Sequence, residues 1–244
     1  ISFKERLQSG EIEVNGYVVV ADRIKRLAGL TARFARLRHL PNEQKKIVFV
    51  LTNSSGKAAQ IGNAVGLDSP ASLMAVFAAM KERGYELDSL PDNSDQLIHN
   101  LIDRCSYDQS YLTSAQVATA LGRVPIATYR QWFAELSEDL QQRMVAQWGS
   151  PEQDIYFVDG SFIIAGLNLG NTILTLQPPR GYGVDQNAIY HQPDLPPTHH
   201  YFAFYRWLSE TFAADAIVHM GKHGTLEWLP GKSVGLSANC FPDA

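Results

Sequence analysis

Residues 47–51 read IVFVL, and residues 69–83 read SPASLMAVFAAMKER. The first run is a continuous series of β-branched and aromatic residues, which is typical of a parallel strand buried on both faces. A polar stretch with two glycines, residues 52–63, separates it from the second run. Ser69 and Pro70 predict the N-cap and the first position of a helix. Strand, polar loop and helix form the half-unit of an open α/β layer, in which ligand-binding loops follow the carboxyl ends of the strands.

The residues before this unit predict one further strand region and one helix. Residues 11–20 (EIEVNGYVVV) are typical of a strand or a strand pair broken at Asn15-Gly16, a dipeptide that favours turns. Residues 21–40 carry an apolar stripe at helical spacing, and Pro41 predicts the end of that helix. We therefore group residues 1–90 as one α/β segment.

The middle of the chain, residues 91–150, is predicted to be mostly helical. Thr113 and Gln116 have the spacing of a capping box. Pro125 and Ser137 predict the starts of two further helices. Their apolar residues recur at helical spacing, so we expect this helical insert to serve packing.

The last segment, residues 151–244, returns to α/β. Short strands between glycine turns are predicted at residues 155–158, 162–164 and 172–174. A helix beginning after Thr198 has aromatic residues around nearly its whole circumference, which indicates burial on most sides. Residues 216–218 predict a buried strand. The predicted fold class is mixed α/β, with strand–loop–helix layers and a helical insert.

Composition narrows the class of protein. Hydrophobic residues make up 45% and charged residues 19% of the 244 residues, which is typical of a globular protein with an ample core. The net charge of −4 gives no general attraction to nucleic acid or to anionic membranes. No apolar run reaches the about 20 residues that a membrane span needs, and we see no signal-peptide pattern. Cys105 and Cys240 form no metal-binding pair. We expect a cytoplasmic protein.

Chemically capable side chains gather in residues 214–243 (ADAIVHMGKHGTLEWLPGKSVGLSANCFPD). His219, His223 and Glu227 recur at intervals of four, which would place them on one face of a helix. They would equally converge across a tight loop, because the neighbouring glycines allow close backbone approach. Two imidazoles and a carboxylate suit a divalent first-row metal or acid–base chemistry. The alternative is a structural role for each histidine through hydrogen bonds.

Two better-known motifs are absent from this stretch. The zinc-protease pattern requires Glu directly after the first His, where Met220 stands. A phosphate-binding P-loop requires a glycine five residues before Gly231, where Leu226 stands. We therefore expect no Walker-type ATP site here.

The string HMGKHGTLEWLPGKSVGLSANCFPD (residues 219–243) resembles the signature of the large subunits of class I tetrapyrrole metal chelatases, and more narrowly those of the CobN type. Magnesium chelatase H subunits typically have Thr at position 222 and Phe-Met or Phe-Thr at 228–229. Further strings that resemble the same family are IGNAVGLDSPASL (61–73), GRVPIATYRQWF (122–133), GLNLGN (166–171) and QPPRGYGVD (177–185).

The resemblance implies a fragment of a much larger multidomain subunit. Such a subunit binds hydrogenobyrinic acid a,c-diamide and inserts cobalt(II) during aerobic cobalamin biosynthesis. Cobalt is then a substrate and the corrinoid macrocycle a ligand. ATP with magnesium is bound by AAA+ ATPase and integrin-I-like partner subunits of the CobS/CobT or ChlI/ChlD type, not by this chain. We expect the fragment alone to be inactive.

Within this function, the chemistry of the side chains indicates a role for each candidate residue. His219, His223 and Glu227 are the candidate metal ligands, and Glu227 and His223 the candidate catalytic bases that accept pyrrole protons. Arg180 is a candidate clamp for a substrate carboxylate, because a guanidinium pairs with it bidentately; the alternative is an exposed loop arginine. The other substrate-binding candidates are Lys232, Asp185, His199 and His200.

Three other functions remain open from the sequence. One is a magnesium chelatase large subunit that inserts magnesium into protoporphyrin IX. A second is a tetrapyrrole-binding module without chemistry of its own. The third is a metal-dependent hydrolase built on His219, His223 and Glu227.

Overall fold

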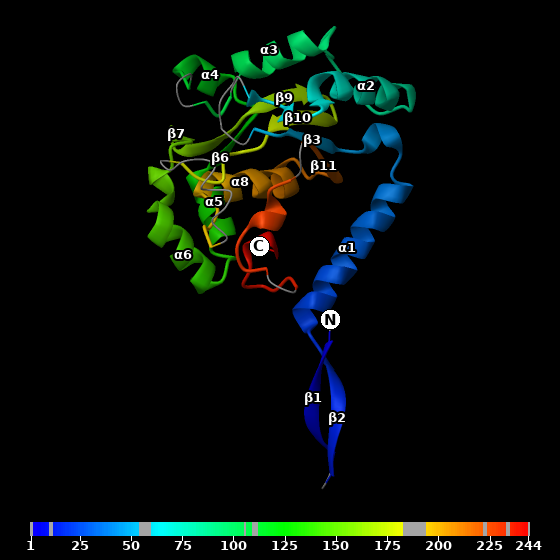
Figure 1. Ribbon diagram of the computed structural model, residues 1–244, viewed down its shortest axis with the longest axis vertical. Helices are drawn as coiled ribbons and strands as arrows, with labels where there is room; N and C mark the ends of the chain where they lie inside the picture. Colours follow the sequence, from blue (N-terminus) through cyan, green and yellow to red (C-terminus); the bar gives the residue numbers. More distant parts are fainter. Residues whose placement is uncertain are drawn as a thin grey trace. The chain divides into compact units, whose positions relative to one another are not determined.

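The computed structural model describes residues 2–9, 12–53, 60–104, 106–108, 112–182, 194–221, 224–232 and 235–243. The chain divides into two compact units, Ile1–Leu40 and Pro41–Ala244. Figure 1 shows the helices and strands of each unit. None of the described helices combines the length and the apolar character needed to cross a lipid bilayer.

The first unit contains a β-hairpin and a long helix. Strands β1 (Ser2–Ser9) and β2 (Ile12–Val19) pair antiparallel along their whole length. The predicted break at Asn15-Gly16 is wrong, because both residues lie within β2 and pair with β1. The turn preference of that dipeptide gives way to the ladder hydrogen bonds of a partner strand that the sequence pattern did not indicate.

The predicted helix at residues 21–40 is confirmed as α1 (Ala21–His39). Its C-cap is Leu40, whose backbone is extended because the ring of the following Pro41 disfavours helical geometry in the residue before it. No residue of α1 is buried.

The second unit is built on a four-stranded sheet. Its strands, in spatial order, are β11 (Ala216–Met220), β3 (Ile47–Leu51), β10 (Thr172–Leu176) and β9 (Gly166–Leu169). Strands β10 and β11 both run parallel to β3, and β9 runs antiparallel to β10. The predicted buried parallel strand β3 is confirmed, and all its residues are buried. In register, Leu51 lies beside Leu176 and Met220, so the three parallel strands end together.

Helices cover both faces of this sheet (Figure 1). One face packs against α2 (Ser69–Glu82) and α3 (Ser94–Arg104), with the short α4 (Ser114–Ala118) beside them. The other face packs against α5 (Ile126–Phe133), α6 (Glu138–Trp148) and α8 (His199–Arg206). Successive residues of β3 alternate between the two cores, as a strand's period of two requires: Phe49 joins the first and Val50 the second.

Smaller elements complete the unit. A second sheet has the antiparallel order β6 (Gly122–Pro125), β8 (Ser161–Ile164) and β7 (Phe157–Val158). A short hairpin pairs β4 (Asn63–Ala64) with β5 (Leu67–Asp68). Further short helices among the described residues are η1 (Asn42–Gln44), η4 (Pro151–Gln153), the π-helical η5 (Trp207–Thr211), η6 (Leu226–Trp228) and η7 (Phe241–Asp243).

The capping residues in the sequence predicted where α4 begins, and predicted the start of α2 to within one residue. The capping box of Thr113 and Gln116 is confirmed at the start of α4. The predicted N-cap Ser69 is wrong by one residue, because Asp68 Oδ1 accepts the hydrogen bond from the Ala71 N–H at 2.9 Å. A carboxylate in that position satisfies a free helix N–H group at least as well as a serine hydroxyl.

The burial predicted for residues 216–218 is wrong. Strand β11 is the outermost strand of the sheet in the described part of the chain, and Ile217 and Val218 are 38% and 37% exposed.

The mixed α/β class predicted from the sequence is confirmed, since strands and helices alternate along the chain and the main sheet contains parallel strands. The sequence-based segments 1–90, 91–150 and 151–244 follow changes in local pattern and stay a prediction. The compact units have other bounds, because β3, β10 and β11 come from distant parts of the chain and share one sheet.

Candidate functional site

The carboxyl ends of three parallel strands meet at one edge of the main sheet. Beyond β10, the Gln177 N–H donates to the Leu51 carbonyl at 2.8 Å. Beyond β3, the Thr52 N–H donates to the Met220 carbonyl at 3.0 Å. These two hydrogen bonds join the carboxyl ends of β3, β10 and β11 to one another. Ligands of open α/β sheets bind at this kind of edge.

Three buried polar side chains lie in the segments that leave this edge. Asn53, Gln177 and Arg180 are 0%, 3% and 2% exposed. The alternative of an exposed loop arginine at position 180 is therefore wrong. Removing a guanidinium from water is costly unless an anion or strong acceptors surround it. A guanidinium pairs with a carboxylate through two parallel hydrogen bonds, so Arg180 stays a candidate for holding one.

Helix α8 contributes a tyrosine to the same edge. The Tyr205 hydroxyl donates to Gln177 Oε1 at 2.8 Å. Burial raises the pKa of Tyr205 well above its ordinary value, so the phenol keeps its proton and acts as a donor. Its ring centroid lies 6.3 Å from that of His219 on β11. The tyrosine therefore links the end of β10 to the first histidine of the signature string.

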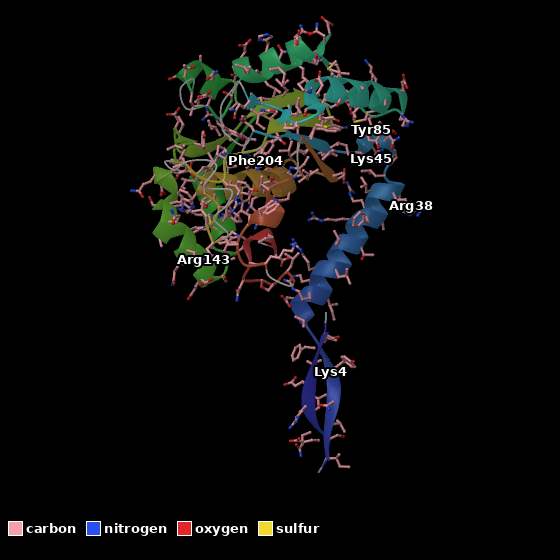
Figure 2. The ribbon with its side chains drawn as sticks, viewed as in Figure 1. Lys4, Arg38, Lys45, Tyr85, Arg143 and Phe204 are labelled. Carbon is pink, nitrogen blue, oxygen red and sulfur yellow. The ribbon has the colours of Figure 1, made fainter. Side chains whose placement is uncertain are left out.

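The signature string is anchored against α8 on its way out of β11. The Thr225 and Tyr201 hydroxyls share a buried hydrogen bond of 2.5 Å. Further along, Leu229 and Phe241 are buried in the core below the sheet, together with Phe204 of α8. The guanidinium of Arg143 on α6 lies 5.3 Å from the Phe241 ring centroid, and Figure 2 labels Arg143 and Phe204.

A glycine of the string is required by close packing. Gly231 has a φ of +104°, which other residues rarely adopt. A Cβ at this position would lie 2.7 Å from the Cα of Cys240. The backbone of the string therefore crosses itself here at a separation that only glycine allows.

The structure excludes one of the two arrangements considered for the histidine and glutamate set. His219 lies on strand β11 and position 227 lies in the 3₁₀-helix η6, so they do not share a continuous helix face. The helical arrangement is wrong, and the tight-loop arrangement remains. The placement of His223 and the side chain of Glu227 fall outside the described residues, as does Asp185. Among the side chains that are described, no three His, Cys, Asp or Glu residues form a metal cluster. The proposed metal set therefore stays a prediction.

His199 is enclosed at the start of α8. It is 0% exposed, and its Nδ1 lies 2.6 Å from the Tyr129 hydroxyl. Its Nε2 lies 3.0 Å from the Gly149 carbonyl, which makes Nε2 the donor and Nδ1 the acceptor. Burial lowers its pKa, so the ring is neutral near pH 7. These contacts favour a packing role.

His200 is enclosed in the same way. Its Nε2 donates to the Ile163 carbonyl at 2.8 Å, and burial lowers its pKa to about 4. Its ring packs against those of Tyr107 and Tyr156. The substrate-binding role expected for His199 and His200 finds no support in this geometry, and we leave both out of the proposed site.

The beginning of α8 is held by a buried carboxyl group that no sequence pattern singled out. Asp154 accepts hydrogen bonds from the backbone N–H groups of His200 at 2.9 Å and Tyr156 at 3.0 Å. Burial raises the pKa of Asp154 to about 6. Its place at a helix N-terminus is favourable for the charged form. Asp154 thus positions the helix that carries Tyr201 and Tyr205.

Comparison with known proteins identifies the family. The family model described as CobN/Magnesium Chelatase matches residues 1–244. The chain belongs to the CobN/magnesium chelatase family. It is 43% identical to the aerobic cobaltochelatase subunit CobN of Pseudomonas aeruginosa, over 100% of this chain and 20% of that relative. It is 31% identical to the magnesium-chelatase H subunit of Rhodobacter capsulatus, over 96% of this chain and 19% of that relative.

A solved member of the CobN/magnesium chelatase family has the same fold. The catalytic subunit of cobaltochelatase from Mycobacterium tuberculosis superposes with a TM-score of 0.81 at 43% identity. The match covers 99% of this chain and 20% of that subunit. The chain therefore spans about a fifth of the length of the relatives that it matches.

Two family residues of the signature string are exposed. Lys232 and Trp228 both lie at the surface, with Trp228 53% exposed. Lys232 remains a candidate partner for a substrate carboxylate. Sequence reasoning missed Asn53 and Gln177, although each follows the end of a strand that it had predicted. Their position after these strands could have identified them as site candidates, because residues that follow parallel strands lie at the edge where such sheets bind ligands.

Proposed function

We propose that this chain is part of a CobN-type cobaltochelatase large subunit and supplies part of the surface that binds the corrinoid and receives cobalt(II). The observation that carries the proposal is the 43% identity to a CobN subunit over the whole chain, against 31% to a magnesium-chelatase H subunit. The proposed macrocyclic substrate is hydrogenobyrinic acid a,c-diamide.

The polar edge of the main sheet supports this assignment. A corrinoid diamide carries both carboxylate and carboxamide groups around its rim. Buried Arg180 supplies a cation for a carboxylate, and buried Asn53 supplies an amide. The tyrosines of α8 reach the same region through Gln177 and Thr225.

Metal insertion exchanges the inner N–H proton of the macrocycle for the ion. Cobalt(II) gives up water ligands and binds the four ring nitrogens, and the corrin, which binds metal as a monoanion, releases one proton. We assign delivery of the ion to His219 and His223, because imidazole nitrogens bind divalent first-row metals. We assign acceptance of the proton to Glu227, with His223 as the second candidate. Lys232 completes the set as a partner for substrate carboxylate.

The proposal includes partners outside this chain. ATP hydrolysis belongs to AAA+ and integrin-I-like subunits of the CobS/CobT or ChlI/ChlD type. The absence of a Walker motif from the sequence agrees with that division of labour. A cytoplasmic location remains part of the proposal. The 244-residue chain by itself is expected to insert no metal.

The test is a reconstituted insertion assay with the full-length subunit, partner subunits and ATP. Cobalt(II) and magnesium(II) are each offered with hydrogenobyrinic acid a,c-diamide and with protoporphyrin IX, and insertion is followed by absorbance. We expect turnover only for cobalt with the diamide. Turnover of magnesium with protoporphyrin IX instead would establish the magnesium chelatase alternative.

The same assay separates the remaining alternatives. A tetrapyrrole-binding module without chemistry would bind the diamide and retain full insertion after Glu227→Gln. A metal-dependent hydrolase would show hydrolytic turnover with bound metal and no tetrapyrrole. The isolated 244-residue chain serves as the negative control.

A further inference from the structure

Asn53 is a buried amide with no hydrogen-bond partner among the residues that the structure describes. Its side chain is 0% exposed, and within that part of the chain neither Oδ1 nor Nδ2 makes a hydrogen bond. It follows Thr52 at the carboxyl end of β3, which lies between β10 and β11 in the sheet. An amide removed from water without new hydrogen bonds raises the free energy of the folded state, so such a group in a native protein requires an explanation.

Gln177 is a second buried amide at this edge, and it differs from Asn53 in having hydrogen-bond partners. Its Oε1 accepts from the Tyr205 hydroxyl at 2.8 Å. Its Nε2 donates to the Pro178 carbonyl at 3.3 Å. Among the described residues, both the oxygen and the nitrogen of the Gln177 amide therefore have hydrogen-bond partners. The Oδ1 and Nδ2 atoms of Asn53 have none there. The open amide lies at the edge where open α/β sheets bind their ligands.

We propose that Asn53 determines specificity by pairing with a carboxamide group of the tetrapyrrole substrate. This inference rests on the function proposed above. A primary carboxamide offers N–H donors and a carbonyl acceptor, so one of its N–H groups and its carbonyl match the Oδ1 and Nδ2 of Asn53 in a pair of hydrogen bonds. A carboxylate offers acceptors only and leaves Oδ1 without a donor. Asn53 thus selects an amidated macrocycle, while Arg180 holds one of its carboxylates.

The Asn53 side chain is 0% exposed, so its contact with a macrocycle requires a rearrangement of this edge. A site built to hydrogen-bond a polar group discriminates strongly against analogues that leave its buried atoms unpaired. The expected selectivity is therefore for the diamide over the corresponding acid, which differs from it only at the amidated positions.

The test compares binding of hydrogenobyrinic acid a,c-diamide and hydrogenobyrinic acid to the full-length subunit by fluorescence quenching. The variants are Asn53→Leu, which keeps approximate volume, and Asn53→Ala, which tests the same loss with a smaller side chain. Asn63→Leu is the matched control, since Asn63 is an exposed amide on β4. Thermal unfolding is recorded for every variant.

We expect the wild-type subunit to prefer the diamide by about tenfold or more. Both Asn53 variants should bind the diamide and the acid equally, with the affinity for the acid unchanged. Asn53→Leu should unfold at the same temperature as the wild type or higher, because it removes an unsatisfied amide. Asn63→Leu should keep the wild-type preference.

Two results would overturn the inference while leaving the proposed function intact. One is a diamide preference that persists in a folded Asn53 variant. The other is wild-type protein that binds diamide and acid equally. A wild-type subunit that binds neither corrinoid would instead contradict the proposed function itself.

Discussion

The Cα of Gly221 lies against the Thr52 side chain, where the ends of β11 and β3 meet. A Cβ on Gly221 would lie 2.6 Å from Thr52 Cβ and would overlap its hydroxyl oxygen, and the glycine φ is +139°. The Thr52 N–H donates to the Met220 carbonyl directly beside this contact. The first glycine of the signature string is therefore fixed by the spacing of two parallel strands.

Gly221→Ala should lower the free energy of unfolding of the second unit. Backbone strain at a positive φ costs about 1–3 kcal/mol, and the overlap with Thr52 adds to it. Urea denaturation of Gly221→Ala measures the loss, and Gly235→Ala is the control because a Cβ there meets open space. The double variant Thr52→Gly/Gly221→Ala should recover part of the loss. Equal stability of the two alanine variants would show that the contact is not limiting.

Asp154 and His200 should contribute opposite pH dependences to stability. Burial raises the pKa of Asp154 from 3.8 to about 6, so between these values the folded protein holds the extra proton and stability falls as the pH rises. Burial lowers the pKa of His200 from 6.5 to about 4, so there the unfolded chain holds the extra proton and stability rises with pH. In the wild type the two contributions largely cancel.

Asp154→Asn should remove the carboxyl contribution to the pH dependence of stability and leave that of His200 uncompensated. The free energy of unfolding should then rise by up to about 3 kcal/mol between pH 4 and pH 6.5. At pH 7 the variant should be about 1–3 kcal/mol less stable, because one of two buried N–H groups loses its acceptor. Denaturation series across this range measure both effects, with exposed Asp159→Asn as the control. A flat profile in Asp154→Asn would contradict the assignment.

Arg180→Ala should weaken binding of hydrogenobyrinic acid a,c-diamide to the full-length subunit. Loss of a charge-assisted hydrogen bond costs about 1.5–3 kcal/mol, or roughly ten- to a hundredfold in affinity. Cobalt binding should not change, and Arg180→Lys should recover only part of the loss because lysine cannot pair bidentately. Exposed Arg104→Ala is the control. An unchanged dissociation constant for a folded Arg180→Ala subunit would remove Arg180 from the site.

Glu227→Gln should separate binding from insertion. The change keeps volume and removes the charge, so the full-length variant should fold and bind the diamide nearly normally. Cobalt insertion with partners and ATP should fall on the order of 100-fold or more, as loss of a general base typically costs. Glu210→Gln, a change in the half-exposed ion pair with Arg206, is the control. Near-native insertion by Glu227→Gln would exclude the residue from the chemistry.

Local chemistry made several features predictable. The run Ile47–Leu51 predicted a buried parallel strand, and Thr113 with Gln116 predicted a capping box; both are confirmed. These signals depend on residues that are adjacent or one helical turn apart. The signature at residues 219–243 likewise identified the family, because its glycines, histidines and aromatic residues are contiguous in the chain.

Partners distant in the chain decided the rest. Asn15-Gly16 lies inside β2 because β1 pairs with it, and Arg180 is buried although its glycine-rich surroundings are typical of an exposed loop. His199 is enclosed by Tyr129, which lies 70 positions away. Such contacts leave no trace in local periodicity.

The sequence by itself determined the fold class, most helix starts and the family, because backbone preference and capping act over a few residues. Only the tertiary structure brought the ends of β3, β10 and β11 together, and with them Asn53, Gln177 and Arg180. Burial is a property of the whole packed chain, and it is burial that makes the Asn53 amide costly without a partner. The sequence therefore fixes which chemical groups are present at this edge. The fold decides how far they are removed from water, and so how much free energy a hydrogen-bond partner contributes there.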